Sequence, residues 1–145
     1  MKTLVTVSMA VLLLLSLPLA ARAGDFDGIK PLLCSVITVI ECTPEDGCRE
    51  VAPDSVALPS FLKVDFEKKT VTAVRESDGN RNSDINRLEH VGGLVILQGV
   101  DEGIQEVRDG VGWTTAISKE TGNFVLTASG HEVAFIVYGA CTPLP

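Results

Sequence analysis

The order of hydrophobic and polar residues predicts a chain of short β-strands. From Leu32 onward, runs rich in β-branched and aromatic residues alternate with turn residues, and no stretch keeps a helical period for more than a turn or two. The runs "GGLVILQG" and "EVAFIVYGAC" have apolar residues on both faces of the expected strand, which is typical of strands that surround a packed interior. The pattern predicts an all-β fold, either an antiparallel up-and-down barrel or a strongly coiled sandwich of about eight strands.

The stretch "GWTTAISKETGNFVLTASG" predicts the clearest hairpin. A four-residue loop that ends at Gly122 joins two alternating runs, and glycine accepts the positive φ that such loops need. The loop sets a register in which three pairs share one face: Ile117 with Phe124, Thr115 with Leu126, and Trp113 with Ala128. A slip of one residue would turn the apolar side chains of one strand to the opposite face, so pattern and loop agree on this register.

A second hairpin is expected at "FLKVDFEKKTVTAV", with Leu62, Val64 and Phe66 on one face and a turn near Glu67. Two longer polar connections, 76–84 and 101–111, are expected to interrupt the order of hairpins.

Four cysteines predict two disulfides, since an even number in a small exported chain is usually a disulfide framework. The stretch "LLCSVITVIECT" has the composition of one strand, which would hold Cys34 and Cys42 roughly 26 Å apart. A disulfide needs Cα atoms within about 7 Å, so this pairing is excluded unless the strand is broken. We favour Cys34 with Cys141 and Cys42 with Cys48; the rival arrangement pairs Cys34 with Cys48 and Cys42 with Cys141.

The first 23 residues have the pattern of a secretory signal peptide. Lys2 supplies a basic start, a long apolar run follows, and "ARA" at 21–23 is a cleavage pattern before Gly24. We therefore expect a signal peptide over 1–23, one β-barrel-like domain over 24–145, and no membrane anchor after cleavage. The predicted location is the periplasm or the extracellular space.

The charge balance argues against nucleic acid as a partner. Cleavage removes Lys2 and Arg22 from twelve basic residues, which leaves ten against nineteen acidic ones and a formal charge of −9. Binding to nucleic acid or to an anionic membrane rests on clustered basic residues, which this composition disfavours.

Several motifs spread over nearly the whole mature chain support these expectations. They are "CSVITVIEC" with a third cysteine after a short turn, "LPSFLKVDFEKKTV", "ILQG", "GW" and the terminal "FIVYGAC". In these motifs the chain resembles a group of small exported bacterial proteins that have no assigned function. The motifs consist of glycines, cysteines and apolar strand residues, so the resemblance implies a fold and a location and transfers no catalytic residue.

The stretch "DGNRNSDINRLE", residues 78–89, matches part of the calcium-loop template, from Asp78 at the first position to Glu89 at the last. The sixth position, where glycine is expected, is Ser83, and both flanking segments have β character instead of the helices that an EF-hand needs. We therefore expect a polar turn that enters a strand, with no metal and no cofactor.

The chain has no recognisable catalytic signature. His90 and His131 are its only histidines, each beside a glutamate that would point to the opposite face of a strand. There is no G-x-S-x-G elbow, no H-E-x-x-H and no phosphate-binding glycine motif. A hydrolase that uses dispersed carboxylates and one of these histidines is the least favoured of three hypotheses about function.

The candidate ligand-binding residues are Trp113 and Tyr138, as aromatic walls at a barrel mouth, and Arg81 and Arg108 in the two polar connections. If those connections share one rim, the arginines would hold an anionic group. The preferred function is a non-catalytic binding or structural module, with a small molecule in its interior or an envelope protein on its loops. The alternative is an inhibitor or envelope-assembly factor that acts through its surface.

We predict that the mature protein begins at Gly24, because the cleavage pattern ends at Ala23. N-terminal sequencing of the exported protein checks this. A mature chain that still begins at Met1 would contradict the signal-peptide assignment.

Overall fold

The computed structural model describes residues 25–74, 81–103 and 110–145. The predicted signal peptide, residues 1–23, lies outside them. In chain order the elements are β1 (Leu32–Thr43), β2 (Gly47–Val51), the 3-10 helix η1 (Pro53–Val56), β3 (Phe61–Asp65), β4 (Thr70–Val74), β5 (Arg81–Val91), β6 (Leu94–Asp101), β7 (Val111–Ser118), β8 (Asn123–Ser129) and β9 (Ala134–Pro143). Within the described ranges, no helix is long and apolar enough to cross a membrane.

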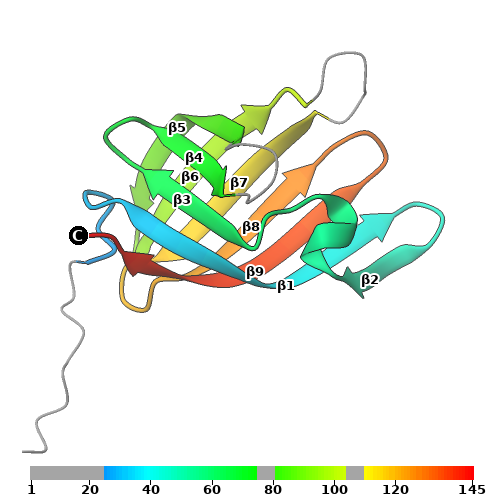
Figure 1. The fold of residues 1–145 in the computed structure, drawn as a ribbon, viewed down its shortest axis with the longest axis horizontal. Helices are drawn as coiled ribbons and strands as arrows, with labels where there is room; N and C mark the ends of the chain where they lie inside the picture. The colour runs from blue at the N-terminus through cyan, green and yellow to red at the C-terminus, as the bar shows by residue number, and fades with distance from the viewer. Residues whose placement is uncertain (1–24, 75–80, 104–109) are drawn as a thin grey trace, which may run out of the picture.

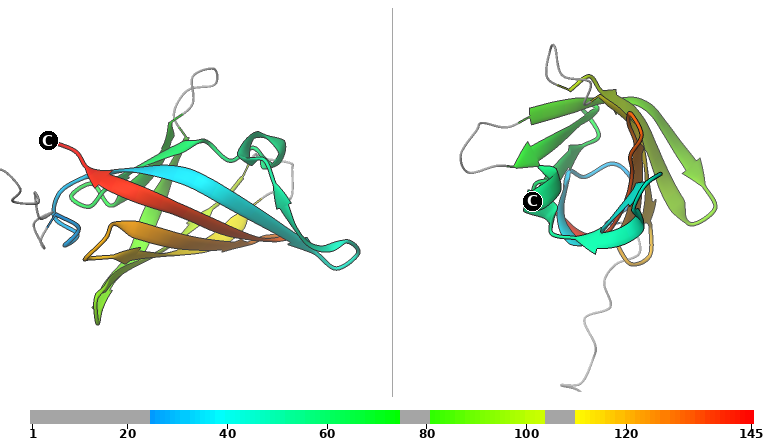
Figure 2. Two further views of the ribbon diagram at one scale, coloured as in Figure 1. Left: turned by 90° about the horizontal axis from the view of Figure 1, so that it is seen from below. Right: turned by 90° about the vertical axis from the view of Figure 1, so that its right-hand side faces the viewer.

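The strands close into an antiparallel barrel, as predicted (Figure 1). Strands β3 to β9 follow one another as neighbours, and β1 lies between β9 and β3 and completes the ring of eight. The view from the right-hand side in Figure 2 shows the strands arranged around this ring. β2 is a ninth strand that extends the sheet beside β1. The barrel alternative is therefore correct and the sandwich is not.

β1 has two partners along one of its edges. Its first part pairs with β3 and its second part with β2, whereas β9 pairs with nearly its whole length on the other edge. A bulge lies at Ile37, where the pairing steps from Val36–Gly139 to Thr38–Tyr138. Such a bulge bends the strand, which lets β1 follow the barrel wall and then continue outward with β2.

The two predicted hairpins have the expected registers. β7 and β8 are paired as Ile117–Phe124, Thr115–Leu126 and Trp113–Ala128. In the β3–β4 hairpin, Leu62, Val64 and Phe66 are buried, as their alternation indicated. The side chain of Asp65 accepts the backbone N–H of Lys68 at 2.9 Å in the turn, and this hydrogen bond lowers the pKa of the Asp65 carboxyl.

The interior is filled with apolar side chains at the end of the barrel where β1 begins. Leu32, Val95 and Ile117 are almost completely buried there. Phe26 precedes β1 and is also buried; its ring lies so close to Gly122 that a Cβ at that position would overlap it. Gly122 has a φ of 72°, which favours glycine in the tight β7–β8 loop. The N-terminal segment thus closes this end.

Two inward-facing aromatic rings lie against glycines of the neighbouring strand. Phe124 is paired with Gly139, and Trp113 is paired with Gly99. A Cβ at either glycine would overlap the partner ring. Glycine therefore allows each ring to lie flat against the barrel wall, a recurrent arrangement in β-sheets.

Both predicted disulfides are present. Cys34 and Cys141 lie directly opposite each other on β1 and β9, with Cα atoms 3.8 Å apart, and both are buried. Cys42 and Cys48 are opposite each other in the β1–β2 hairpin, with Cα atoms 4.0 Å apart. β1 is one strand from Leu32 to Thr43, which is why Cys34 and Cys42 do not pair with each other.

The prediction of a polar connection over 76–84 is wrong at its second end, because β5 begins at Arg81. Arg81 pairs with Ala73 and Asp84 with Thr70 of β4. The polar sequence fits a strand here, since its outward positions are exposed and its inward positions reach an open end of the barrel. Residues 81–89 of the calcium template are therefore extended chain, whereas Asp78 and Asn80 lie outside the described residues.

We predict that the Cys34–Cys141 disulfide contributes more stability than the Cys42–Cys48 disulfide. It closes a loop with a sequence separation of 107, against 6 for the other. By chain entropy, replacing both Cys34 and Cys141 by alanine should lower the free energy of unfolding by about 4 to 5 kcal/mol, and replacing Cys42 and Cys48 by about 2 kcal/mol.

Chemical denaturation of the two double variants measures the difference. Equal losses, or a larger loss for the Cys42–Cys48 variant, would show that closure of β1 on β9 does not depend on the covalent link.

Candidate functional site

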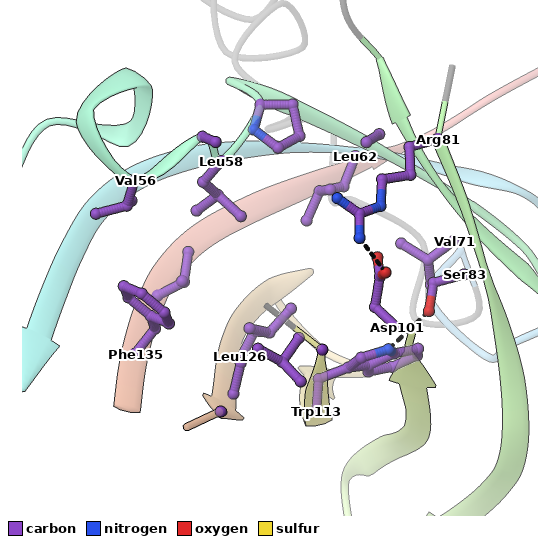
Figure 3. A pocket seen from close by; sticks show the side chains of 18 of the residues that line it. Val56, Leu58, Leu62, Val71, Arg81, Ser83, Asp101, Trp113, Leu126 and Phe135 are labelled. Carbon is purple, nitrogen blue, oxygen red and sulfur yellow. Dashed lines mark hydrogen bonds and ion pairs between the residues drawn. The ribbon is translucent and has the colours of Figure 1, made fainter. Parts of the chain in front are cut away.

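The end of the barrel opposite Phe26 contains a cavity of about 430 Å³. Its wall is formed by residues from β3 to β9 and by the segment around η1 (Figure 3). The lining is mostly aliphatic and aromatic: Val56, Ala57, Leu58, Pro59, Leu62, Val71, Ala73, Val111, Trp113, Leu126, Ala128, Val133, Phe135 and Val137. A cavity of this size and polarity is within the range that holds small organic ligands.

Trp113 forms one wall of the cavity. Its indole lies against Gly99 of β6, and its Nε1 donates a hydrogen bond of 2.8 Å to the Ser83 Oγ of β5. The Ser83 hydroxyl in turn donates to the carbonyl oxygen of Val100 at 3.0 Å. The indole N–H therefore has its hydrogen-bond acceptor within the barrel wall, and the apolar surface of the ring faces the cavity.

An ion pair lies beside the cavity where β5 begins and β6 ends. The guanidinium of Arg81 donates to the Asp101 carboxylate, and the same carboxylate oxygen, Oδ1, accepts the backbone N–H of Gly103 at 3.0 Å. The Arg81 side chain is 41% exposed and that of Asp101 is 23% exposed. The pair thus separates the apolar interior from solvent.

The segment after β2 supplies the wall on the other side. Pro53 begins the short helix η1, and Ala57 ends it in the left-handed conformation with a φ of 55°. This turn directs Val56 and Leu58 toward the cavity, where they face Phe135 across it (Figure 3).

The structure brings two of the four predicted ligand-binding residues to this cavity, namely Trp113 and Arg81. Tyr138 is on β9 at an outward position, is 44% exposed and does not line the cavity. Arg108 lies outside the described residues. The ligand-binding role of these residues remains a prediction.

Sequence reasoning missed most of the lining. Val56 and Leu58 lie in a segment that has no strand pattern, and only the folded structure places it in the cavity wall. Ser83 was considered as part of a calcium template and Asp101 as part of a connection. The inward alternation of Val71, Ala73 and the residues paired with them would have indicated these positions once the β4–β5 pairing was known.

The histidines lie at opposite ends of the barrel. His90 is near Gly28 and pairs with Val95, whereas His131 lines the cavity. In the part of the chain that the structure describes, no three His, Cys, Asp or Glu side chains form a group suited to a metal ion. The Ser83 hydroxyl donates to a backbone carbonyl and not to a base, so its geometry is that of a structural hydrogen bond.

No protein-family model, no curated protein and no solved structure matches the chain. Its class therefore follows from geometry: a disulfide-bonded antiparallel β-barrel, filled at one end and hollow at the other.

We predict that Gly99→Ala displaces the Trp113 indole, because the added methyl group would overlap the ring and the carbonyl oxygen of Asp84. Forced overpacking of this kind costs about 1 to 3 kcal/mol of stability. Since Trp113 is the sole tryptophan, its emission spectrum should shift.

Gly112→Ala is the matched control, because Gly112 is adjacent to Trp113 and a Cβ there would meet no atom within 4 Å. Denaturation and fluorescence of both variants test the contact. Equal behaviour of the two would contradict the packing of the indole against Gly99.

Proposed function

We propose that this protein is a non-catalytic binding module that holds a small, mainly apolar ligand in the hollow end of its barrel. The observation that carries the proposal is the cavity of about 430 Å³ with its aliphatic walls and the Trp113 surface. Barrels of eight strands are just wide enough either to be filled by side chains or to enclose one small ligand. Here one end is filled and the other is not.

The lining favours an apolar ligand for a physical reason. Transfer of apolar surface from water into such a site is favourable by roughly 25 cal/mol per Å², so even a ligand without specific hydrogen bonds would gain from entering it. Trp113 adds a flat surface against which a ring or a chain can pack.

The proposed place of action is the periplasm or the extracellular space. Disulfides persist in oxidising compartments, and two of them are present. The signal pattern at the N-terminus and the resemblance to small exported bacterial proteins support the same location. A carrier or sensor of small molecules in the bacterial envelope would fit all three features.

A second candidate function is a surface-acting inhibitor or assembly factor. Apolar side chains are exposed on the outer face of β8, β9 and β1: Val125 is 38%, Tyr138 is 44% and Ile37 is 67% exposed. Val125 pairs with Tyr138, which pairs with Thr38 beside Ile37, so the three lie next to one another. Neighbouring apolar residues on an outer face are one mark of a protein-binding surface.

We predict saturable binding of a neutral apolar dye, N-phenyl-1-naphthylamine, with quenching of Trp113 emission. Ala73→Phe should weaken binding by at least about tenfold, equivalent to about 1.4 kcal/mol, since the larger side chain would occupy the cavity that Ala73 lines. Fluorescence titration measures both effects.

Ala116→Phe is the control, because Ala116 of β7 points away from the interior and pairs with Val125 on the outer face. It should bind the dye like the unmodified protein. Loss of binding in Ala116→Phe with full binding in Ala73→Phe would place the dye on the outer surface and favour the second candidate.

A further inference from the structure

We infer that the ligand of the cavity is an amphiphile with an anionic group, which lies against Arg81 at the mouth while the apolar part extends toward Trp113. This inference rests on the proposed function and adds the chemical class and the orientation of the ligand. It follows from the positions of the hydrogen-bonding groups that line the cavity.

The polar groups of the inner wall already have partners. The Trp113 N–H is bonded to Ser83, and the Ser83 hydroxyl to the carbonyl oxygen of Val100. A charged ligand group placed at this depth would lose its hydration without gaining a hydrogen bond, which is strongly unfavourable. The inner part of the cavity therefore selects an apolar moiety.

At the mouth, donor groups are in excess. A guanidinium has five N–H donors, and among the described residues Arg81 directs one nitrogen, Nη2, to Asp101. The Asp101 Oδ1 atom accepts from both Arg81 and Gly103, so this oxygen already has two donors. Within the described residues, the other N–H donors of the partly exposed Arg81 have no protein acceptor, so a ligand acceptor could replace water on them.

The position of Arg81 relative to the cavity supports this role. Arg81 lines the cavity on the same side as Asp101, Ser83 and Val71 (Figure 3), and its side chain is partly open to solvent. The ion pair with Asp101 restrains the guanidinium in this position, so a ligand would bind to a donor group that is already oriented.

Asp101 reduces the attraction for an anion but does not reverse it. A carboxylate on the free edge of the guanidinium would lie roughly twice as far from Asp101 as from Arg81. Because the Coulomb energy varies inversely with distance, the attraction would exceed the repulsion about twofold. Carboxylates are also the partners that the planar guanidinium binds through two parallel hydrogen bonds.

The test compares three ligands that share one chain and differ in the end group: dodecanoate, dodecanol and dodecylamine. Each displaces bound N-phenyl-1-naphthylamine from the protein below its micellar concentration. Dodecanoate should bind at least about tenfold more tightly than dodecanol, and dodecylamine should bind least tightly.

Two variants assign the preference to the mouth. Arg81→Gln should remove the preference for dodecanoate while dye binding remains, and Asp101→Asn should increase it several-fold by removing the competing charge. Both side chains are partly exposed, so neither substitution removes packing from the interior. Dye binding that is retained in each variant shows that it is folded.

The outcomes separate the two proposals. If the dye does not bind the unmodified protein, the proposed function is wrong. If the dye binds but all three ligands displace it equally, or if Arg81→Gln keeps the preference for dodecanoate, the binding function stands and the anionic ligand class is wrong.

Discussion

The pairing of β1 with β9 is the contact on which the rest of the structure depends. Ten residue pairs join the two strands, and without them the sheet would be open, with unpaired N–H and C=O groups along two edges. The contact joins parts of the chain that are far apart in sequence, so forming it has a large entropic cost. The buried Cys34–Cys141 disulfide lies within this pairing and lowers that cost by linking the strands in the unfolded chain.

The same strand β1 also determines why one end of the barrel is hollow. Its contact with β3 covers only four residue pairs, from Leu32–Val64 to Ser35–Phe61, and β2 takes over the edge beyond them. The chain from β2 to β3 runs beside β1 and contains η1 (Figure 2). Val56, the last residue of η1, and Leu58 cover the cavity from the side, where a full-length β3 would otherwise continue the wall.

The interior changes in character along the barrel axis. Phe26 and the fully buried aliphatic side chains fill the end where β1 begins. At the other end, small side chains such as Ala73 and Ala128 line the cavity and leave its space open. The acidic and basic side chains of the described lining, Arg81 and Asp101, form an ion pair and are both partly exposed. An apolar interior with charges at its rim is the arrangement on which both the proposed binding function and the proposed ligand class rest.

The sequence by itself determined the all-β class and the registers of the clearest hairpins, because each follows from local alternation and turn chemistry. For the cysteines, the reach of a single strand excluded one of three pairings, and the structure decided between the other two. It also indicated Trp113 and Arg81 as candidate site residues. Only the tertiary structure decided between barrel and sandwich, since the closing contact of β1 with β9 is non-local. The cavity likewise depends on contacts between segments distant in sequence, such as Val56 and Phe135, which share one lining only when the ring closes. It also depends on small side chains such as Ala73 and Ala128, whose effect is the space left empty between strands.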